Sequence, residues 1–411
     1  MSATLEQARA WDRADSLRDY RSRFALPDGV IYLDGNSLGP PPVTARARVD
    51  ALIAGEWGGG LIRSWNDADW IGAPGRVGGK IARLIGAAET EVIVADSTSV
   101  NLYKLLVAAL AARPDRRIIL TETGNFPTDL YIAGGAAGTG AGRSVRALPP
   151  DEVEAAIGPD TAVVLLTHVH YKTAARRDMA ATTAAAHAAG ALVLWDLSHS
   201  AGAIAVDLSA CDADLAVGCG YKFLNGGPGA PAFLYVAERL QAEMRSPLTG
   251  WMGHAAPFDF VDDYRPAPGI GRFLCGTPPI LGLAALEAGI DLALEIDAAA
   301  LQAKSERLWE LFADLVAAGL AGQAFRLITP RDPALRGSHI SFAHPDGYAI
   351  MQALIAAGVI GDFREPDVMR FGITPLYLGY EDIWRAAETL VQVMAGGAWR
   401  RIPPRAPGQV T

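Results

Sequence analysis

The chain has 411 residues, of which half are hydrophobic and a fifth charged, so it is long enough for two domains or for a large domain with a smaller one. Its net charge of -9 argues against a nucleic-acid partner, because binding to phosphate backbones requires a basic surface. The three cysteines lack the spacing of a metal site, so we expect no metal and reduced thiols in a cytoplasmic protein. No apolar run is long enough to span a membrane, and the charged N-terminal stretch is unlike a signal peptide.

The first distinctive stretch is YLDGNSLGPPP, residues 32–42. It contains G-x-S-x-G, the pattern in which Ser37 would be a hydrolase nucleophile on a strand-turn-helix elbow. The prolines at 40–42 disfavour a helix directly after the turn, since a residue before proline is biased towards extended geometry. We therefore predict an irregular loop, with a helix beginning near Thr44.

Between residues 90 and 240, short apolar runs alternate with helical patterns. The sequence predicts strands at 91–96, 117–122, 144–149, 161–169, 191–196 and 213–220, and helices at 99–112, 126–136, 151–158 and 176–190. Continuous apolar strands between helices indicate an α/β fold with a mainly parallel sheet covered on both faces.

The pattern changes after residue 280. Long helices are predicted at 280–296 and 298–319, followed by strands at 325–330, 338–344 and 368–375 and by helices at 348–358 and 381–397. This is typical of a small α+β domain. We expect an N-terminal segment, 1–45, that packs with the small domain, a large domain at 46–280 and the small C-terminal domain at 281–411.

Polar and aromatic residues follow the predicted strands at the sheet edge where ligands bind. They are Thr98 and Ser99 after the first strand, Phe126 and Asp129 after the second, Asp196 and His199 after 191–196, and Tyr221 and Lys222 after 213–220. Each residue alone is typical of a cap or a turn. As a set they should converge on one edge of one sheet.

This set has the chemistry that pyridoxal phosphate requires. The cofactor needs a lysine for covalent attachment and a carboxylate that keeps its pyridine nitrogen protonated, which Lys222 and Asp196 could supply. Thr98, Ser99 and Tyr221 are neutral donors for a phosphate, and Phe126 could stack on the ring. The sequence therefore predicts a pyridoxal phosphate enzyme of the aspartate-aminotransferase-like fold type I.

From residue 32 to about 380 the chain resembles the kynureninase family. The matching motifs are YLDGNSLGPPP, NFPTDLY, THVHYKTA, WDLSHSAGA, GCGYKFLNGGPGAP, GWMGH, RGSHISF and REPDVMRFGITPLYLGY. The resemblance implies that Ser37 is no hydrolase nucleophile, since DGNSLGP matches a family signature near the active-site mouth.

The resemblance also implies residue roles. Lys222 would be the Schiff-base lysine. The cofactor site would comprise Thr98, Ser99, Phe126, Pro127, Thr128, Asp129, Thr167, Asp196, His199, Tyr221 and Lys222. Trp251 and Thr277 would complete its phosphate end from the neighbouring subunit of a homodimer. Thr277 is a departure, since some members have asparagine there.

For the substrate, Arg370 would bind the α-carboxylate, Asn36 and Ser37 would lie near the mouth of the site, and Trp65 would either border the aryl pocket or be a packed loop residue. The implied reaction is hydrolysis of the Cβ–Cγ bond of L-kynurenine to anthranilate and L-alanine in tryptophan catabolism. The catalytic residues would be Lys222 as the base at Cα, Tyr221 as the acid at Cβ, and Asp196. Preference between kynurenine and its 3-hydroxy form stays open.

Three alternatives remain. A cysteine desulfurase-like or aminotransferase activity is the nearest, but a desulfurase needs a cysteine in a C-terminal loop, and no cysteine follows Cys275. A dinucleotide site at GGAAGTGAG is weakly supported, because the run lacks G-x-G-x-x-G at a strand-to-helix junction. An inactive binding protein on the same scaffold is disfavoured by the intact Lys222, Asp196 and Arg370.

Overall fold

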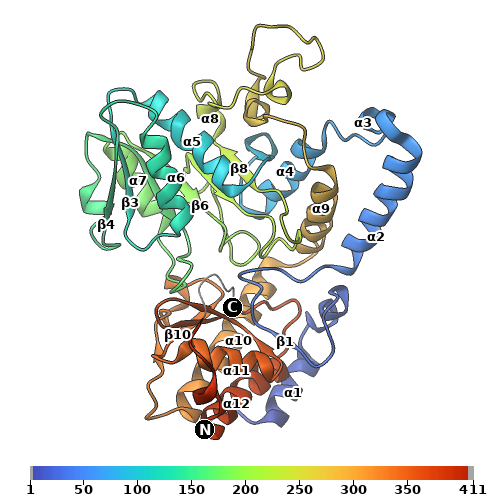
Figure 1. Ribbon diagram of the computed structural model, residues 1–411, viewed down its shortest axis with the longest axis vertical. Coiled ribbons are helices and arrows are strands. Elements are labelled where there is room, and N and C mark those ends of the chain that lie inside the picture. Colours follow the sequence, from blue (N-terminus) through green and yellow to red (C-terminus); the bar gives the residue numbers. More distant parts are fainter. Residues whose placement is uncertain (1–2, 406–411) are drawn as a thin grey trace. The chain divides into compact units, whose positions relative to one another are not determined.

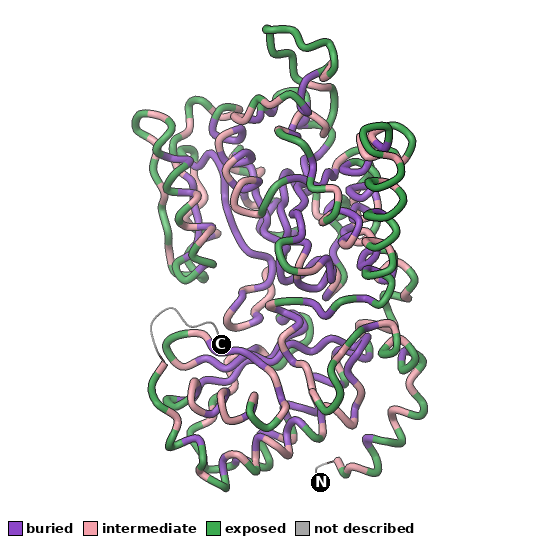
Figure 2. The backbone as a smooth tube through the Cα atoms, turned by 45° about the vertical axis from the view of Figure 1, so that its right-hand side comes forward, coloured by how far each residue is buried: buried purple, intermediate pink, exposed green. Residues whose placement is uncertain are grey.

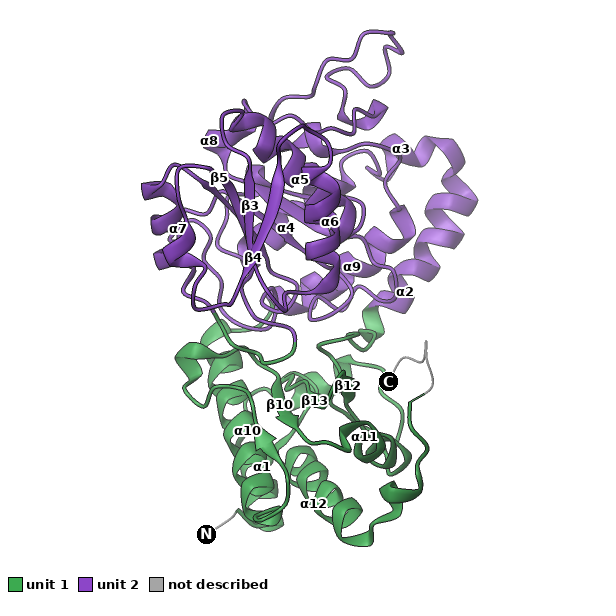
Figure 3. Cartoon of the chain, turned by 60° about the vertical axis from the view of Figure 1, so that its left-hand side comes forward, with its two compact units in different colours: residues 1–44, 172–176, 295–411 green, residues 45–171, 177–294 purple. Residues whose placement is uncertain are grey.

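The computed structural model describes residues 3–405. The chain forms two compact units, coloured separately in Figure 3. Unit 1 comprises residues 1–44, 172–176 and 295–411, and unit 2 comprises residues 45–171 and 177–294. None of the helices within residues 3–405 is both long and apolar enough to cross a membrane.

Unit 2 is an α/β structure built around a seven-stranded sheet (Figure 1). Its strands are β2 (Val92–Val94), β3 (Ile118–Glu122), β4 (Ser144–Leu148), β5 (Thr161–Thr167), β6 (Leu192–Asp196), β7 (Leu215–Gly218) and β8 (Phe233–Val236). Its helices are α2 (Val43–Ala51, beginning in unit 1), α3 (Ser64–Asp67), α4 (Ala73–Leu84), α5 (Thr98–Ala112), α6 (Pro127–Ala137), α7 (Met179–Ala188), α8 (Glu238–Gln241) and α9 (Ile280–Leu294). The described part of unit 2 also contains a π-helix, η2 (Leu52–Gly60), and the short 3-10 helices η6 (Trp251–Gly253) and η7 (Gly269–Phe273).

The strand order of this sheet is β2-β8-β7-β6-β5-β3-β4. β8 runs antiparallel to both of its neighbours, and all other pairs are parallel, which confirms the predicted mainly parallel sheet. The sequence pattern missed β8. The predicted helix at 151–158 was wrong, since only a 3-10 turn forms there, at Glu154–Ala156.

The core of unit 2 lies in the central strands. Every residue of β5, β6, β7 and β8 is buried, and the interior of unit 2 is drawn mostly in purple in Figure 2. Helix α5 packs against α6 and against β5 and β7, whereas α7 contacts β6 and α4 contacts β2 and α9. Because α9 packs on α4, the observed division at residue 295 differs from the boundary expected at 280.

Unit 1 is a smaller α+β structure. Its strands are β1 (Ile31–Tyr32), β9 (Arg326–Leu327), β10 (Ile340–Ala343), β11 (Val359–Ile360), β12 (Asp362–Arg364) and β13 (Val368–Phe371), and its helices are α1 (Leu5–Ala14), α10 (Ala298–Gly319), α11 (Gly347–Ala356) and α12 (Tyr380–Gly396). β12, β13, β10 and β9 form an antiparallel sheet, while β1 pairs in parallel with β11. The N-terminal helix α1 packs against α12, so the first residues belong to unit 1.

Candidate active site

Lys222 lies in a tight loop just after β7. The loop requires a glycine at 220, because a Cβ there would lie 2.4 Å from the carbonyl oxygen of Pro231. Lys222 is buried, and its Nζ lies 3.0 Å from Nε2 of His199. The same ammonium is 5.8 Å from the ring centroids of both Phe126 and Tyr221. The predicted lysine thus has the predicted histidine and two predicted aromatic residues as neighbours.

Two buried carboxylates belong to this site. Asp196 ends β6 and accepts a 2.7 Å hydrogen bond from the backbone N–H of Ser198. Asp129 lies in the first turn of α6, and neither of its carboxylate oxygens has a hydrogen-bond partner of normal geometry among the described residues. Burial raises the pKa of Asp196, and burial together with the charge of Asp196 raises the pKa of Asp129 well above its usual range. A cationic hydrogen-bond donor placed beside Asp129 and Asp196 would therefore stabilise their ionised carboxylates.

Asn125 is a candidate site residue that the sequence analysis did not single out. Its side-chain oxygen accepts hydrogen bonds from the Thr167 hydroxyl at 2.6 Å and from the backbone N–H of Phe126 at 2.7 Å. It therefore joins the end of β5 to the residue before α6 and fixes the backbone that carries the Phe126 ring. The only sequence signal for it was its position in GNFP, directly before Phe126.

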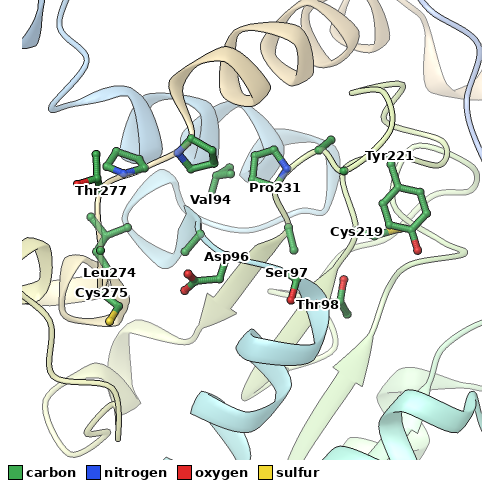
Figure 4. Close-up of a pocket in the computed structure, with 17 residues that line it drawn as sticks. Val94, Asp96, Ser97, Thr98, Cys219, Tyr221, Pro231, Leu274, Cys275 and Thr277 are labelled. Atoms are coloured by element: carbon green, nitrogen blue, oxygen red, sulfur yellow. The ribbon is translucent and has the colours of Figure 1, made fainter.

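A cavity of about 460 Å³ opens beside this cluster (Figure 4). Three predicted hydroxyl residues, Thr98, Tyr221 and Thr277, line it. Ser97 caps α5 by accepting a hydrogen bond from the N–H of Val100, so the first turn of that helix lies at the cavity wall. Burial raises the pKa of the Tyr221 phenol, so its hydroxyl stays protonated at neutral pH and can donate a hydrogen bond.

The other predicted residues of unit 2 lie around these features. Ser99 is in the first turn of α5, and Pro127 and Thr128 open α6. Trp251 begins η6, is 38% exposed and contacts Phe258 edge to face, with ring centroids 5.8 Å apart. Trp65 lies in α3, not in a loop, and packs edge to face on Trp70.

Arg370, the predicted carboxylate-binding residue, is held in an ion pair within unit 1. It lies opposite Asp362 in the β12–β13 register, and both side chains are buried. Its Nε donates to Asp362 Oδ1 at 2.7 Å, its Nη2 also donates to Asp362 and, at 3.0 Å, to the Ser37 hydroxyl. The Ser37 hydroxyl donates to Asp362 at 2.6 Å, and Arg364 adds a second ion pair to Asp362. Although burial opposes it, the Arg370 charge lowers the pKa of Asp362.

The loop at 33–42 contains no strand-to-helix elbow, and α2 starts at Val43, as predicted. Asn36 is fully buried, and neither polar atom of its side chain has a partner among the described residues. Burial, reinforced by the charge of Asp362, raises the pKa of nearby Asp34 to about 7. The loop therefore offers buried polar groups next to the Arg370 ion pair, and Asp34 and Asp362 are functional candidates that the sequence did not single out.

These residues fit pyridoxal phosphate. The unpartnered Asp129 carboxylate and the raised pKa of Asp196 call for a cationic N–H such as that of a protonated pyridine. Thr98, Tyr221 and Thr277 supply neutral hydroxyls in one cavity, and a lysine amine lies in the same cluster. Together with the sheet topology, this donor set defines an enzyme of fold type I, the class that uses pyridoxal phosphate.

Solved structures support the fold. The apo cysteine desulfurase of Thermococcus onnurineus NA1 superposes with a TM-score of 0.77 at 19% identity, covering 92% of this chain and 98% of that one. The cysteine desulfurase CsdA of Escherichia coli gives a TM-score of 0.77 at 21% identity over 93% of this chain and 98% of that one. At such identities the likeness concerns the fold alone.

Sequence relatives identify the family. A family model described as the kynureninase C-terminal domain matches residues 301–390. The kynureninase of Pseudomonas fluorescens is 52% identical over 402 residues, covering 96% of this chain and 97% of the relative. The kynureninase of Burkholderia mallei (strain SAVP1) is 51% identical over 403 residues, 97% of each chain. The chain belongs to the kynureninase family.

Proposed function

We propose that the protein is a hydrolytic enzyme that cleaves the Cβ–Cγ bond of L-kynurenine with water, giving anthranilate and L-alanine. The observation that supports this proposal is the sequence identity to kynureninases, 51–52% over 96–97% of this chain. The cofactor is pyridoxal phosphate, which when bound accepts the electron pair of the bonds broken at the substrate. In this proposal the enzyme acts in tryptophan catabolism and is located in the cytoplasm. A second candidate substrate is 3-hydroxykynurenine.

The cofactor-binding residues act at both ends of the ring system. Asp196, with Asp129 beside it, would hold the protonated pyridine nitrogen, because a buried carboxylate with a raised pKa is stabilised by a cationic donor. The Phe126 ring would lie against the cofactor ring, and the hydrogen bonds from Thr167 and the Phe126 N–H to Asn125 fix the backbone of Phe126. At the phosphate end, Thr98, Ser99 and Tyr221 donate hydrogen bonds.

Lys222 would hold the cofactor covalently and, as a free amine, would move the proton of the substrate Cα. His199, 3.0 Å from its Nζ, orients that amine. Tyr221 supplies a proton to Cβ after anthranilate leaves, a role that fits a phenol kept protonated by burial. Arg370 would bind the α-carboxylate with its guanidinium, with Asn36 and Ser37 beside it, and Trp65 is a candidate for the border of the aryl pocket.

The active unit is a homodimer. Trp251 and the adjoining loop expose Phe258, Phe260 and Val261, and large apolar side chains grouped on a surface are typical of a protein interface. A two-fold symmetric dimer is the commonest assembly. In this arrangement the cavities of the two subunits adjoin at the interface, so that Thr277, which lines the cavity of its own chain, and Trp251 also reach the phosphate end of the partner's site.

The experiment is a substrate comparison on purified protein loaded with pyridoxal phosphate. Kynurenine and 3-hydroxykynurenine are supplied separately, and the aromatic product is followed by fluorescence while alanine is quantified. We expect one alanine per anthranilate. Release of sulfide from cysteine without cleavage of kynurenine would overturn the proposal and support a desulfurase.

Two variants separate the roles. Lys222→Ala should lose the visible absorbance of the bound cofactor and turnover together. Arg370→Ala should keep that absorbance and raise KM for kynurenine. An unchanged KM would remove Arg370 from carboxylate binding.

A further inference from the structure

A buried ammonium that none of these roles uses lies behind the phosphate end of the cavity. Lys104, on α5, has a fully buried side chain. Its Nζ donates to Asp96 Oδ2 at 2.7 Å and to the backbone oxygen of Phe273 at 2.7 Å. A lysine in such surroundings loses its hydration, so both partners are needed to hold its charge.

The two partners belong to two chain segments that contribute to the lining of the same cavity. Asp96 precedes the α5 cap and lines the cavity directly, and Phe273 precedes the lining segment 274–279, which carries Thr277. In Figure 4 the Asp96 carboxylate points towards Leu274 and Cys275. Lys104 therefore connects the turn at Asp96, which precedes Thr98, to Phe273, which precedes the segment that carries Thr277.

The backbone at Asp96 is arranged to keep its carboxylate in this place. Asp96 has φ of +47°, in the left-handed region that side chains other than those of glycine, asparagine and aspartate rarely adopt. Its carbonyl oxygen accepts a 2.9 Å hydrogen bond from the N–H of Ala232, and the N–H of Ala95 donates to the Ala232 oxygen at the same distance. These bonds tie the turn to the segment before β8.

Lys104 also has an electrostatic role, because it compensates the charge of Asp96. The Asp96 side chain is 32% exposed in a cavity that, under the proposed function, receives a phosphate dianion. An uncompensated carboxylate in that cavity would repel the phosphate, whereas Lys104, in direct contact with it, offsets its charge.

We propose that Lys104 is a positioning residue for phosphate recognition: it holds the Asp96 carboxylate in an ion pair and cancels the charge that this carboxylate presents to the cofactor phosphate. The proposal rests on the proposed function only in that the cavity takes a phosphate ester. It predicts an effect specific to the phosphate group rather than to the pyridine ring.

The test compares dissociation constants of pyridoxal phosphate and of pyridoxal for the apoprotein, measured by absorbance and by quenching of protein fluorescence. Lys104→Met should raise the dissociation constant of pyridoxal phosphate about tenfold or more and change that of pyridoxal less than about twofold, because one charge near the phosphate is then uncompensated. In the same variant, inorganic phosphate should raise the melting temperature less than in the wild type.

The double variant Lys104→Met with Asp96→Asn tests whether Lys104 affects phosphate binding through its charge or through the packing of its side chain. Once the carboxylate is also neutral, the affinity for pyridoxal phosphate should return to within about threefold of wild type. No recovery, or an equal loss of affinity for pyridoxal, would show that Lys104 acts through packing alone and would overturn the proposal.

Two further variants complete the set. If Lys104→Met does not fold, Asp96→Asn decides by itself, since removal of the carboxylate should leave pyridoxal phosphate affinity unchanged or tighter, and weaker binding refutes the proposal. The matched control is Lys80→Met, which breaks ion pairs to Glu287 and Asp291 away from the cavity and should leave both affinities unchanged. Because these readouts are binding constants, a wild type that binds pyridoxal phosphate but does not cleave kynurenine would refute the proposed function and leave this inference intact.

Discussion

The buried ion pair between Asp362 and Arg370 predicts a large stability effect from a single substitution. The Arg370 and Asp362 side chains are 2% and 1% exposed, and Asp362 also contacts Arg364 and the Ser37 hydroxyl. Asp362→Ala would leave one buried and one half-buried guanidinium without this counter-ion. Breaking such a pair from one side costs about 3–5 kcal/mol, which for a unit of this size lowers the melting temperature by roughly 6–20 °C.

The assay is differential scanning calorimetry together with urea denaturation, so that the transition of unit 1 is followed apart from that of unit 2. The matched control is Asp314→Ala, which removes an exposed ion pair to Arg331 and should cost no more than about 1 kcal/mol. Asp362→Asn, which keeps the shape but loses the charge, should fall between the two. If Asp362→Ala unfolds within about 1 kcal/mol of the wild type, the reasoning about a desolvated guanidinium is refuted.

Three further changes test the loop at 33–42 and the cofactor wall. Asp34 has a pKa raised from 3.8 to about 7, so the native state binds more protons than the unfolded state between these values, and wild-type stability falls as pH rises through that window. Asp34→Asn should remove this component, roughly 2–4 kcal/mol at most, and urea midpoints that change with pH in parallel for both proteins would contradict it. Asn125→Ala deprives the backbone N–H of Phe126 of its acceptor and should destabilise the apoprotein by about 1–3 kcal/mol and weaken pyridoxal phosphate binding, whereas unchanged values for both would show that water replaces the amide. Gly35→Ala would place a Cβ 2.2 Å from the Tyr377 hydroxyl and should cost about 1–3 kcal/mol, and Tyr377→Phe in the same chain should recover part of it in a double-mutant cycle.

Local sequence patterns were sufficient for most of the parallel strands of the large sheet whose residues are all buried. The apolar runs at β5 and β6 are continuous, so they could only be buried strands, and both form where the pattern predicted. The polar residues after these strands also followed from the sequence, because parallel strands end at a common edge. The identity of Lys222, Asp196 and Tyr221 as candidates needed no coordinates.

Long-range pairing decided the elements that the pattern missed. β8 has an apolar run as clear as the others, but its place between β2 and β7 comes from antiparallel pairing with residues far away in the chain, which no local period encodes. The helix expected at 151–158 is only a 3-10 turn at Glu154–Ala156, because the propensity of so short a segment is easily overridden by tertiary packing.

The sequence by itself determined which chemical groups this protein brings to its site: an amine, carboxylates, hydroxyls and a guanidinium. Only the tertiary structure decided the state of those groups. The Asp129 carboxylate is buried without a hydrogen-bond partner of normal geometry among residues 3–405, Asp362 is bound to Arg370 across a strand pair and to Ser37 from the other end of the chain, and Lys104 is joined to Phe273, 169 residues away. The physical reason is that ionisation and hydrogen bonding depend on desolvation and on neighbouring charges, and the residues that supply both are distant in the sequence and meet only when the chain is folded.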